Sequence, residues 1–205
     1  MKAPSAEYQQ KLVDVLGQYE GGKVNLATAR LELQDFLAET GYEPLLGEEG
    51  TLDDLGSEER INLVLDTISA LDAGYRNWIY IQQAPILDEW PAQELLRAAP
   101  SEKPRDWIRR WTDAGGKLYD GRMIALVNDN IWVKISRLGL PYSPFDLGSH
   151  MRVRAIDRDT AMKYGLIDRD TQIPPQDFVR YALLHSSVRN TLLFGNLRLL
   201  SKEIV

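Results

Sequence analysis

Histidine is the natural starting point for chemistry, because imidazole is the side chain that most readily exchanges protons near neutral pH. The chain has two, His150 and His185. Asp146, Ser149 and His150 supply the residue types of a hydrolytic triad, but the adjacent Ser149 and His150 cannot easily present a nucleophile to its own base. A second hypothesis places Arg122, Asp146 and His150 in one cleft, as a nuclease or a transferase would. His185 is expected at the end of a helix, as a surface residue or a satisfied core residue.

Other reactive groups are scarce. Cysteine is absent, which excludes disulfides, thiolate zinc sites and cysteine nucleophiles. The chain has no Gly-x-Ser-x-Gly elbow, no phosphate-binding glycine loop, no His-Glu-x-x-His and no EF-hand loop. Three acidic pairs, at 48–49, 53–54 and 58–59, are expected to be solvated or to lie near helix starts. We therefore predict no catalytic residue, no metal and no cofactor, and we expect a protein that is not an enzyme.

Tryptophan and arginine gather in the middle third of the chain. One interpretation is a platform on which nucleic-acid bases stack. The other is a tryptophan-rich core with arginines lying over it, which the i, i+4 spacing of Trp107 and Trp111 favours if they lie on a helix. The tryptophans are Trp78, Trp90, Trp107, Trp111 and Trp132, and the arginines are Arg105, Arg109, Arg110, Arg122 and Arg137.

Charge is distributed unevenly over the 205 residues. Residues 1–96 hold 6 basic and 18 acidic side chains, whereas residues 97–170 hold 14 basic and 10 acidic ones. Such a dipolar chain suits contact with two unlike partners, and its overall charge of −6 is too acidic for a typical duplex-DNA binder. No apolar run approaches the roughly 20 residues that span a bilayer. The N-terminus lacks the apolar segment of a signal peptide, so we expect synthesis in the cytoplasm and no membrane contact.

Apolar periodicity predicts helices in the first 82 residues. Ser5 and Asn25 are placed to cap two helices that form an N-terminal hairpin within residues 1–46. The clearest periodic signal follows Ser57 and predicts a long central helix over residues 57–82. Gly74 lies inside it and costs about 1 kcal/mol relative to alanine, so we expect another backbone to approach closely there. The acidic, glycine-containing segment 42–56 is the best candidate for an internal boundary.

The second half predicts shorter elements. Residues 122–127 and 151–156 are expected to form strands of one small sheet, and Pro104 to lie in the first turn of a helix. Residues 91–96 favour a short helix or an extended segment, and Pro85 is expected to end the central helix region. The prediction is an α+β fold, predominantly helical, with an N-terminal helical hairpin, a long central helix and a small β-sheet in the C-terminal half.

Two consecutive segments carry a resemblance. Residues 122–132 (RMIALVNDNIW) and 138–146 (LGLPYSPFD) resemble the C-terminal signature of phage Mu F-like minor head, or head morphogenesis, proteins. That signature has an arginine before a short strand, an acidic segment with tryptophan, a proline-rich turn and a basic strand. Here the turn is residues 141–144 and the basic strand is MRVR at 151–154. Residues 60–67 and 73–78 are similar to the long helix of the family.

The resemblance implies a virion structural or assembly protein of the head or neck, made in the host cytoplasm and bound near the portal. It divides the chain into a hairpin (1–46), a Mu F-like core (57–170) and a C-terminal tail (171–205). Portal or other head and neck proteins are the expected partners, within a larger homo- or hetero-oligomeric assembly, and packaged DNA could touch the Arg/Trp region. A rigid loop loses little entropy on docking, although it could equally pack on its own domain. The candidate interface residues are Pro141, Tyr142, Pro144, Phe145, Arg152 and Arg154.

Overall fold

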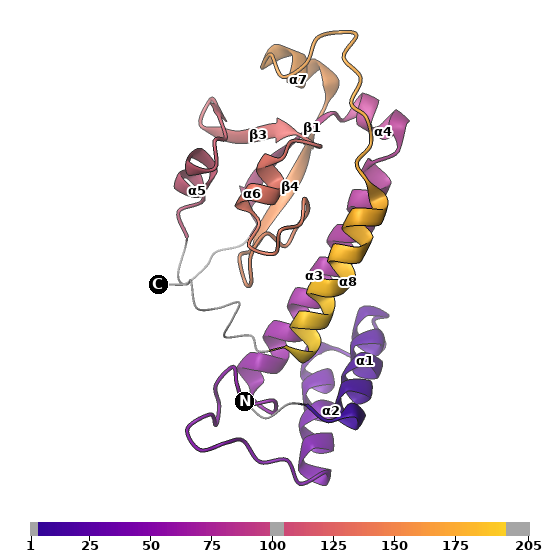
Figure 1. Ribbon diagram of the computed structural model, residues 1–205, viewed down its shortest axis with the longest axis vertical. Coiled ribbons are helices and arrows are strands. Elements are labelled where there is room, and N and C mark those ends of the chain that lie inside the picture. The colour runs from indigo at the N-terminus through magenta and orange to yellow at the C-terminus, as the bar shows by residue number, and fades with distance from the viewer. Residues whose placement is uncertain (1–3, 99–104, 196–205) are drawn as a thin grey trace. The chain divides into compact units, whose positions relative to one another are not determined.

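A computed structural model describes residues 4–98 and 105–195 (Figure 1). Contacts divide the chain into two compact units, unit 1 (residues 1–69 and 186–205) and unit 2 (residues 70–185). This boundary differs from the predicted one, because it falls inside the long helix rather than in segment 42–56. The helices are α1 (Ala6–Glu20), α2 (Leu26–Glu39), α3 (Glu58–Ile81), α4 (Ala84–Glu89), α5 (Trp107–Asp113), α6 (Ile131–Ile135), α7 (Arg158–Lys163) and α8 (Phe178–Phe194). The strands are β1 (Ala92–Arg97), β2 (Leu118–Tyr119), β3 (Arg122–Leu126) and β4 (Met151–Ile156).

Unit 1 contains the predicted helical hairpin. The Ser5 hydroxyl accepts a hydrogen bond from the Tyr8 amide, and the Asn25 side chain accepts one from the Thr28 amide, so both helices begin where their caps predict. The apolar stripe of α1 is buried. The expected helical hairpin and long helix are therefore confirmed.

Segment 42–56 of unit 1 is ordered by its own polar groups. The Asp54 carboxylate accepts hydrogen bonds from the amides of Gly50 (3.0 Å) and Gly56 (2.9 Å). Arg60 is buried beneath the segment and donates to the carbonyl oxygen of Leu52 (2.7 Å). Asp54 is also buried rather than solvated, contrary to expectation. The segment is thus a packed connection.

Unit 2 is built on a four-stranded antiparallel sheet in the order β2-β3-β1-β4 (Figure 1). Residues 122–126 and 151–156 are strands as predicted, but they do not pair with each other. β1 lies between them, pairing Leu95 with Met123 of β3 and with Val153 of β4. Of the two alternatives for residues 91–96, the extended one is correct.

The two faces of the sheet are covered by different elements. Leu95 and Ala125 pack on one face against a cluster that includes Trp111, Trp132 and Phe145. Ala92, Ile124 and Ile156 lie on the other face, against the region of α7. Side chains alternate between faces along a strand, so every strand residue is assigned to the tryptophan face or to the α7 face.

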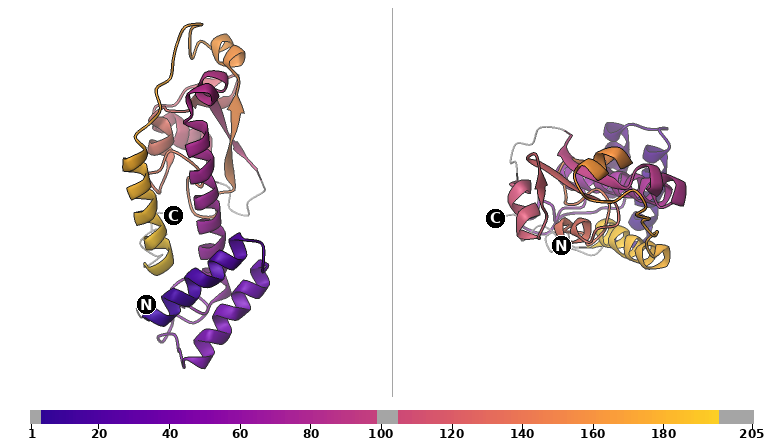
Figure 2. Two further views of the ribbon diagram at one scale, coloured as in Figure 1. Left: turned by 90° about the vertical axis from the view of Figure 1, so that its right-hand side faces the viewer. Right: turned by 90° about the horizontal axis from the view of Figure 1, so that it is seen from above.

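Three helix boundaries differ from the sequence prediction. Pro85 lies in the first turn of α4 rather than ending the helical region, since proline lacks only an amide that a first turn does not use. α5 begins at Trp107 after the Asp106 cap, and Pro104 lies outside the described residues. α8 runs from Phe178 to Phe194 (Figure 2), so His185 lies in the middle of a helix rather than at the end of one. Within the described part of the chain, no helix has both the length and the apolar character needed to cross a membrane.

Candidate functional site

The proline-rich loop of the signature is held inside unit 2 by a buried relay of polar side chains. The Tyr142 hydroxyl lies 3.2 Å from Nδ1 of His185, and Nε2 of His185 lies 2.9 Å from Oδ1 of Asp72 on α3. Tyr75 stacks on the imidazole ring with centroids 4.3 Å apart. Burial raises the pKa of Tyr142. This keeps its hydroxyl protonated and disfavours a nucleophilic role, so the relay is suited to fixing the loop.

Gly74 explains how the loop comes so close to α3. A Cβ atom at this position would lie 1.9 Å from the carbonyl oxygen of Ser143. Only glycine allows such an approach, which confirms the close backbone contact expected from the sequence. Trp78, one turn further along α3, packs its ring against Tyr142 at a centroid distance of 5.6 Å. The relay and this contact together fix the loop on α3.

Asp146 lies at the end of the same loop and gathers three arginines. It is 2% exposed. Its carboxylate lies 2.9 Å from Nη1 of Arg110, 3.6 Å from Nε of Arg105 and 3.9 Å from Nη1 of Arg137. The backbone amide of Leu147 donates to it at 2.8 Å. The surrounding guanidinium groups balance the charge of this buried carboxylate, and its contact with Arg110 ties α5 to the loop.

Arg122 makes a separate cluster on the α7 face of the sheet. Its guanidinium binds Glu94 of β1 through Nε (3.0 Å) and Nη2 (2.7 Å), and Nη1 donates to the Tyr164 hydroxyl (3.1 Å). Arg154 of β4 binds the same carboxylate. The hydrogen bonds from Arg122 lower the pKa of Glu94. They also raise the pKa of Arg122, so this pair stays ionised.

The alternative site of Arg122, Asp146 and His150 is not assembled. Arg122 is engaged with Glu94 on the α7 face, whereas Asp146 is held by arginines of α5 and its surroundings. His150 is exposed and has a positive φ of 50°. The cleft that this hypothesis requires is therefore not formed by these three residues.

The candidate interface residues divide into buried and exposed groups. Pro141, Tyr142 and Phe145 are buried, so their rings pack within unit 2 rather than offering surface anchors. Arg152 and Arg154 are exposed on β4. The list is completed by Pro144, which is half-buried.

The tryptophans form a core rather than a stacking platform. Trp107, Trp111 and Trp132 are at most 4% exposed. The indole N–H of Trp111 donates to the Lys117 carbonyl (2.8 Å), and that of Trp132 donates to the Leu126 carbonyl (2.7 Å). Bases cannot stack on rings that are covered on both faces. The core interpretation is the correct one for these three residues.

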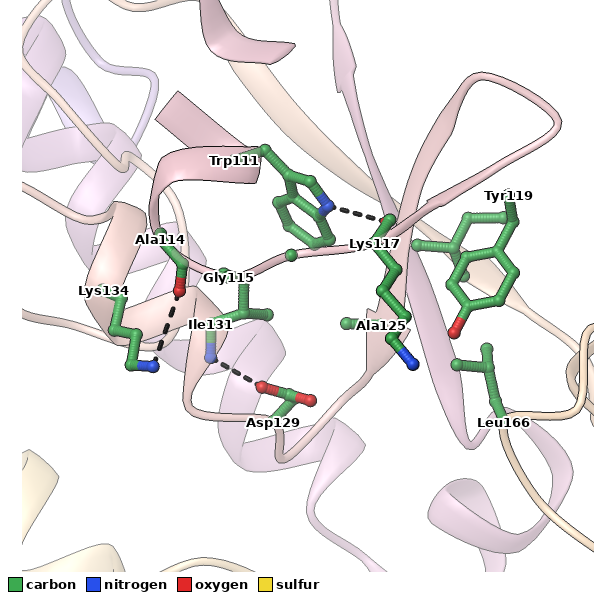
Figure 3. Close-up of a pocket in the computed structure, with 12 residues that line it drawn as sticks. Trp111, Ala114, Gly115, Lys117, Tyr119, Ala125, Asp129, Ile131, Lys134 and Leu166 are labelled. Carbon is green, nitrogen blue, oxygen red and sulfur yellow. Dashed lines mark hydrogen bonds between the residues drawn. The ribbon is translucent and has the colours of Figure 1, made fainter. Parts of the chain in front are cut away.

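A pocket of about 240 Å³ opens between the end of α5, the start of α6 and the β2–β3 hairpin (Figure 3). Its apolar lining includes Trp111 and Ile131. Lys117, Lys134 and Asp129 bring charge to it, and Figure 3 shows the carboxylate between the two lysine side chains. Asp129 accepts a hydrogen bond from the Ile131 amide (2.7 Å). None of the residues that line this pocket is a serine, threonine, cysteine or histidine, and its titratable side chains are those of Lys117, Tyr119, Asp129 and Lys134.

A second pocket of about 290 Å³ lies along the tryptophan face of the sheet near β4. Side chains of α3, α4, β1 and β4 line it, with Tyr80 and Trp90 as its aromatic members and Val153 and Ala155 as the contribution of β4. Tyr80 is 55% exposed. Among the described residues no group of three or more potential metal ligands comes together.

Comparison with known proteins gives no relative. No family model, no curated protein sequence and no solved structure matches the chain.

Sequence reasoning missed the relay. His185 is a satisfied core residue, one of its two expected environments, but its partners Asp72 and Tyr142 are far away along the chain. No local motif joins the three, and only the packing of the loop on α3 and α8 brings them together. The role of Glu94 could not be predicted, because the sequence leaves its segment open between a short helix and an extended strand.

Proposed function

We propose that this chain is a phage or prophage virion protein of the minor head, head morphogenesis or neck class, which acts through protein–protein contacts during capsid assembly. The observation that carries the proposal is the part that the signature residues play in unit 2. Trp132 and Phe145 belong to one core cluster, and Asp146 fixes α5 to the loop. Residues that resemble a family signature thus behave as fold determinants, as expected if the resemblance reflects a common architecture.

The electrostatics are compatible with a docking role. Arg152 and Arg154 remain exposed on a strand at the edge of the sheet. Exposed basic groups of this kind steer association with acidic neighbours and set the specificity of contact. The acidic character of residues 1–96 provides the opposite sign elsewhere in the chain.

A particle experiment tests the proposal. The gene is deleted from the phage or prophage that encodes it, and particles from the deletion strain and a complemented strain are purified for mass spectrometry, electron microscopy and infectivity assays. We expect the protein in complemented particles, and defective or empty heads without it. Normal infectious particles from the deletion strain, or particles that lack the protein in the complemented strain, would refute the proposal.

The alternative, a phage-borne nuclease or transferase, predicts a different outcome. His150→Ala would then abolish turnover of nucleic acid or nucleotide while leaving assembly intact. For a docking protein, complementation by His150→Ala should restore infectivity fully, because this side chain is exposed and lies outside the core of unit 2.

A further inference from the structure

The outer edge of β4 offers unpaired backbone groups. Among the described residues, β4 pairs only with β1. The Ala98 amide donates to the His150 carbonyl (2.9 Å), one register step before the pairing of Arg97 with Met151. Opposed residues in an antiparallel ladder alternate between bonded and non-bonded pairs. The amides and carbonyls of Val153 and Ala155 therefore point away from β1, toward the edge.

The two faces of this edge differ in chemistry. Val153 and Ala155 contribute to the apolar pocket on the tryptophan face, next to the exposed ring of Tyr80. Arg152 and Arg154 project from the α7 face. The edge thus presents apolar and basic side chains in strict alternation.

The basic face has an excess of positive charge. Arg122 and Arg154 share a single carboxylate, that of Glu94, so one of these two positive charges is not balanced by this group. No ion pair of Arg152 occurs within the described part of the chain, and 60% of the Arg154 side chain is exposed. An incoming segment with carboxylates on this face would meet two exposed guanidinium groups.

We propose that β4 is a docking edge for an extended segment of a partner protein in which apolar and acidic residues alternate. The segment would add a fifth strand to the sheet, with its apolar side chains over the pocket and its carboxylates beside Arg152 and Arg154. Main-chain hydrogen bonds supply affinity in this mode of recognition, and alternate side chains supply specificity. The inference rests on the proposed function and names the chemistry of the partner.

A labelled ten-residue peptide with alternating valine and glutamate tests the edge by fluorescence anisotropy. A valine–lysine peptide controls for charge, and a peptide with the same valine and glutamate content in two blocks controls for alternation. Ala155→Pro removes an amide that points outward without removing a bond to β1, whereas Ala155→Val keeps the amide. Arg152→Glu reverses the charge of an exposed side chain outside the core.

We expect saturable binding of the valine–glutamate peptide, slower hydrogen exchange at the Val153 and Ala155 amides, and at least tenfold weaker binding in Ala155→Pro and Arg152→Glu. Ala155→Val, which keeps the outward amide, should bind the peptide more tightly than Ala155→Pro does. Absence of binding, equal binding of the lysine or block peptide, or insensitivity to Arg152→Glu would each overturn the proposal. Self-association of the chain that Ala155→Pro abolishes would also overturn it, because a second copy would then occupy the edge.

This experiment separates the inference from the proposed function. If the protein is present in particles but does not bind the peptide, only the docking-edge proposal is refuted. If the protein binds the peptide but is absent from particles, the docking edge is supported and the virion proposal is refuted.

Discussion

Replacing Gly74 with alanine would separate two opposing effects at one position. In a helix interior, alanine is favoured over glycine by about 1 kcal/mol. At Gly74, however, the new Cβ atom would lie 1.9 Å from the Ser143 carbonyl oxygen. Ordinary contact begins at 3.4 Å, so α3 and the loop would have to separate by about 1.5 Å. Overpacking costs about 1–3 kcal/mol, and both colliding atoms belong to restrained backbone, which places the cost in the upper part of that range.

We therefore expect Gly74→Ala to lower the free energy of unfolding by about 1–2 kcal/mol after the gain in helix propensity is included. Gly17 in α1 is the matched control, because no atom lies within 4 Å of a Cβ built there. Gly17→Ala should stabilise the chain by up to about 1 kcal/mol.

The free energy of unfolding is measured by urea denaturation, with far-ultraviolet circular dichroism and tryptophan fluorescence as the two probes of unfolding. Both probes are needed because two compact units need not unfold in a single transition. Trp78, which packs against Tyr142, reports on the loop contact. If Gly74→Ala stabilises the chain as much as Gly17→Ala does, the close approach of the loop to α3 is wrong.

Three further substitutions test the polar clusters of unit 2. Arg122 lowers the pKa of Glu94 from 4.5, so the stability that the Glu94 carboxylate contributes is present above about pH 4.5 and is lost as the pH falls. Glu94→Gln should therefore lose less stability on acidification than the unchanged chain. Urea denaturation between about pH 6 and pH 3 should show the free energies of unfolding of the two proteins converging in acid. Asp146→Asn should cost roughly 3 kcal/mol at pH 7 in urea denaturation, because three arginines lose their shared counter-charge; a cost below about 0.5 kcal/mol would contradict this account. Tyr142→Phe should lower the free energy of unfolding by about 1–3 kcal/mol, because it removes the hydroxyl that partners the buried His185. An unchanged midpoint of thermal unfolding would argue against the relay.

Much of the helical architecture followed from local chemistry. Ser5 and Asn25 cap the helices they were expected to cap, and the periodicity after Ser57 gave the long helix to within a residue or so. These signals are local: a capping side chain bonds an amide two or three positions away, and a buried stripe repeats every turn. Gly74 could be interpreted because a costly residue in a strong helix requires a compensating contact.

The sheet was harder to predict, and β1 shows why. Its sequence, AQELLR, carries no β-branched residue and favours helix on propensity alone. Strands on both sides nevertheless satisfy its backbone, and its first four residues are buried. Tertiary context overrides propensity in such a central strand. The pairing of β3 and β4 with β1, rather than with each other, could not follow from patterns that describe one segment at a time.

The burial of two candidate interface residues could not be predicted for a related reason. Tyr142 and Phe145 belong to a proline-rich turn, and aromatic residues in such a turn suit docking as far as the turn alone indicates. The long-range partners that bury them, above all His185 and Trp132, were not visible from the turn itself. Arg152 and Arg154 lie on a strand over residues 151–156 as predicted, because two-residue alternation of apolar and polar side chains is a local signal.

The burial of the 138–147 loop changes what natural variation in this region would mean. A substitution at Phe145 or Asp146 would act first on whether unit 2 folds, and only through that on any partner. Arg152 can change without disturbing the core. Sequence change at the rim of the sheet would therefore alter the surface of unit 2 while the turn, and with it the fold, stays the same.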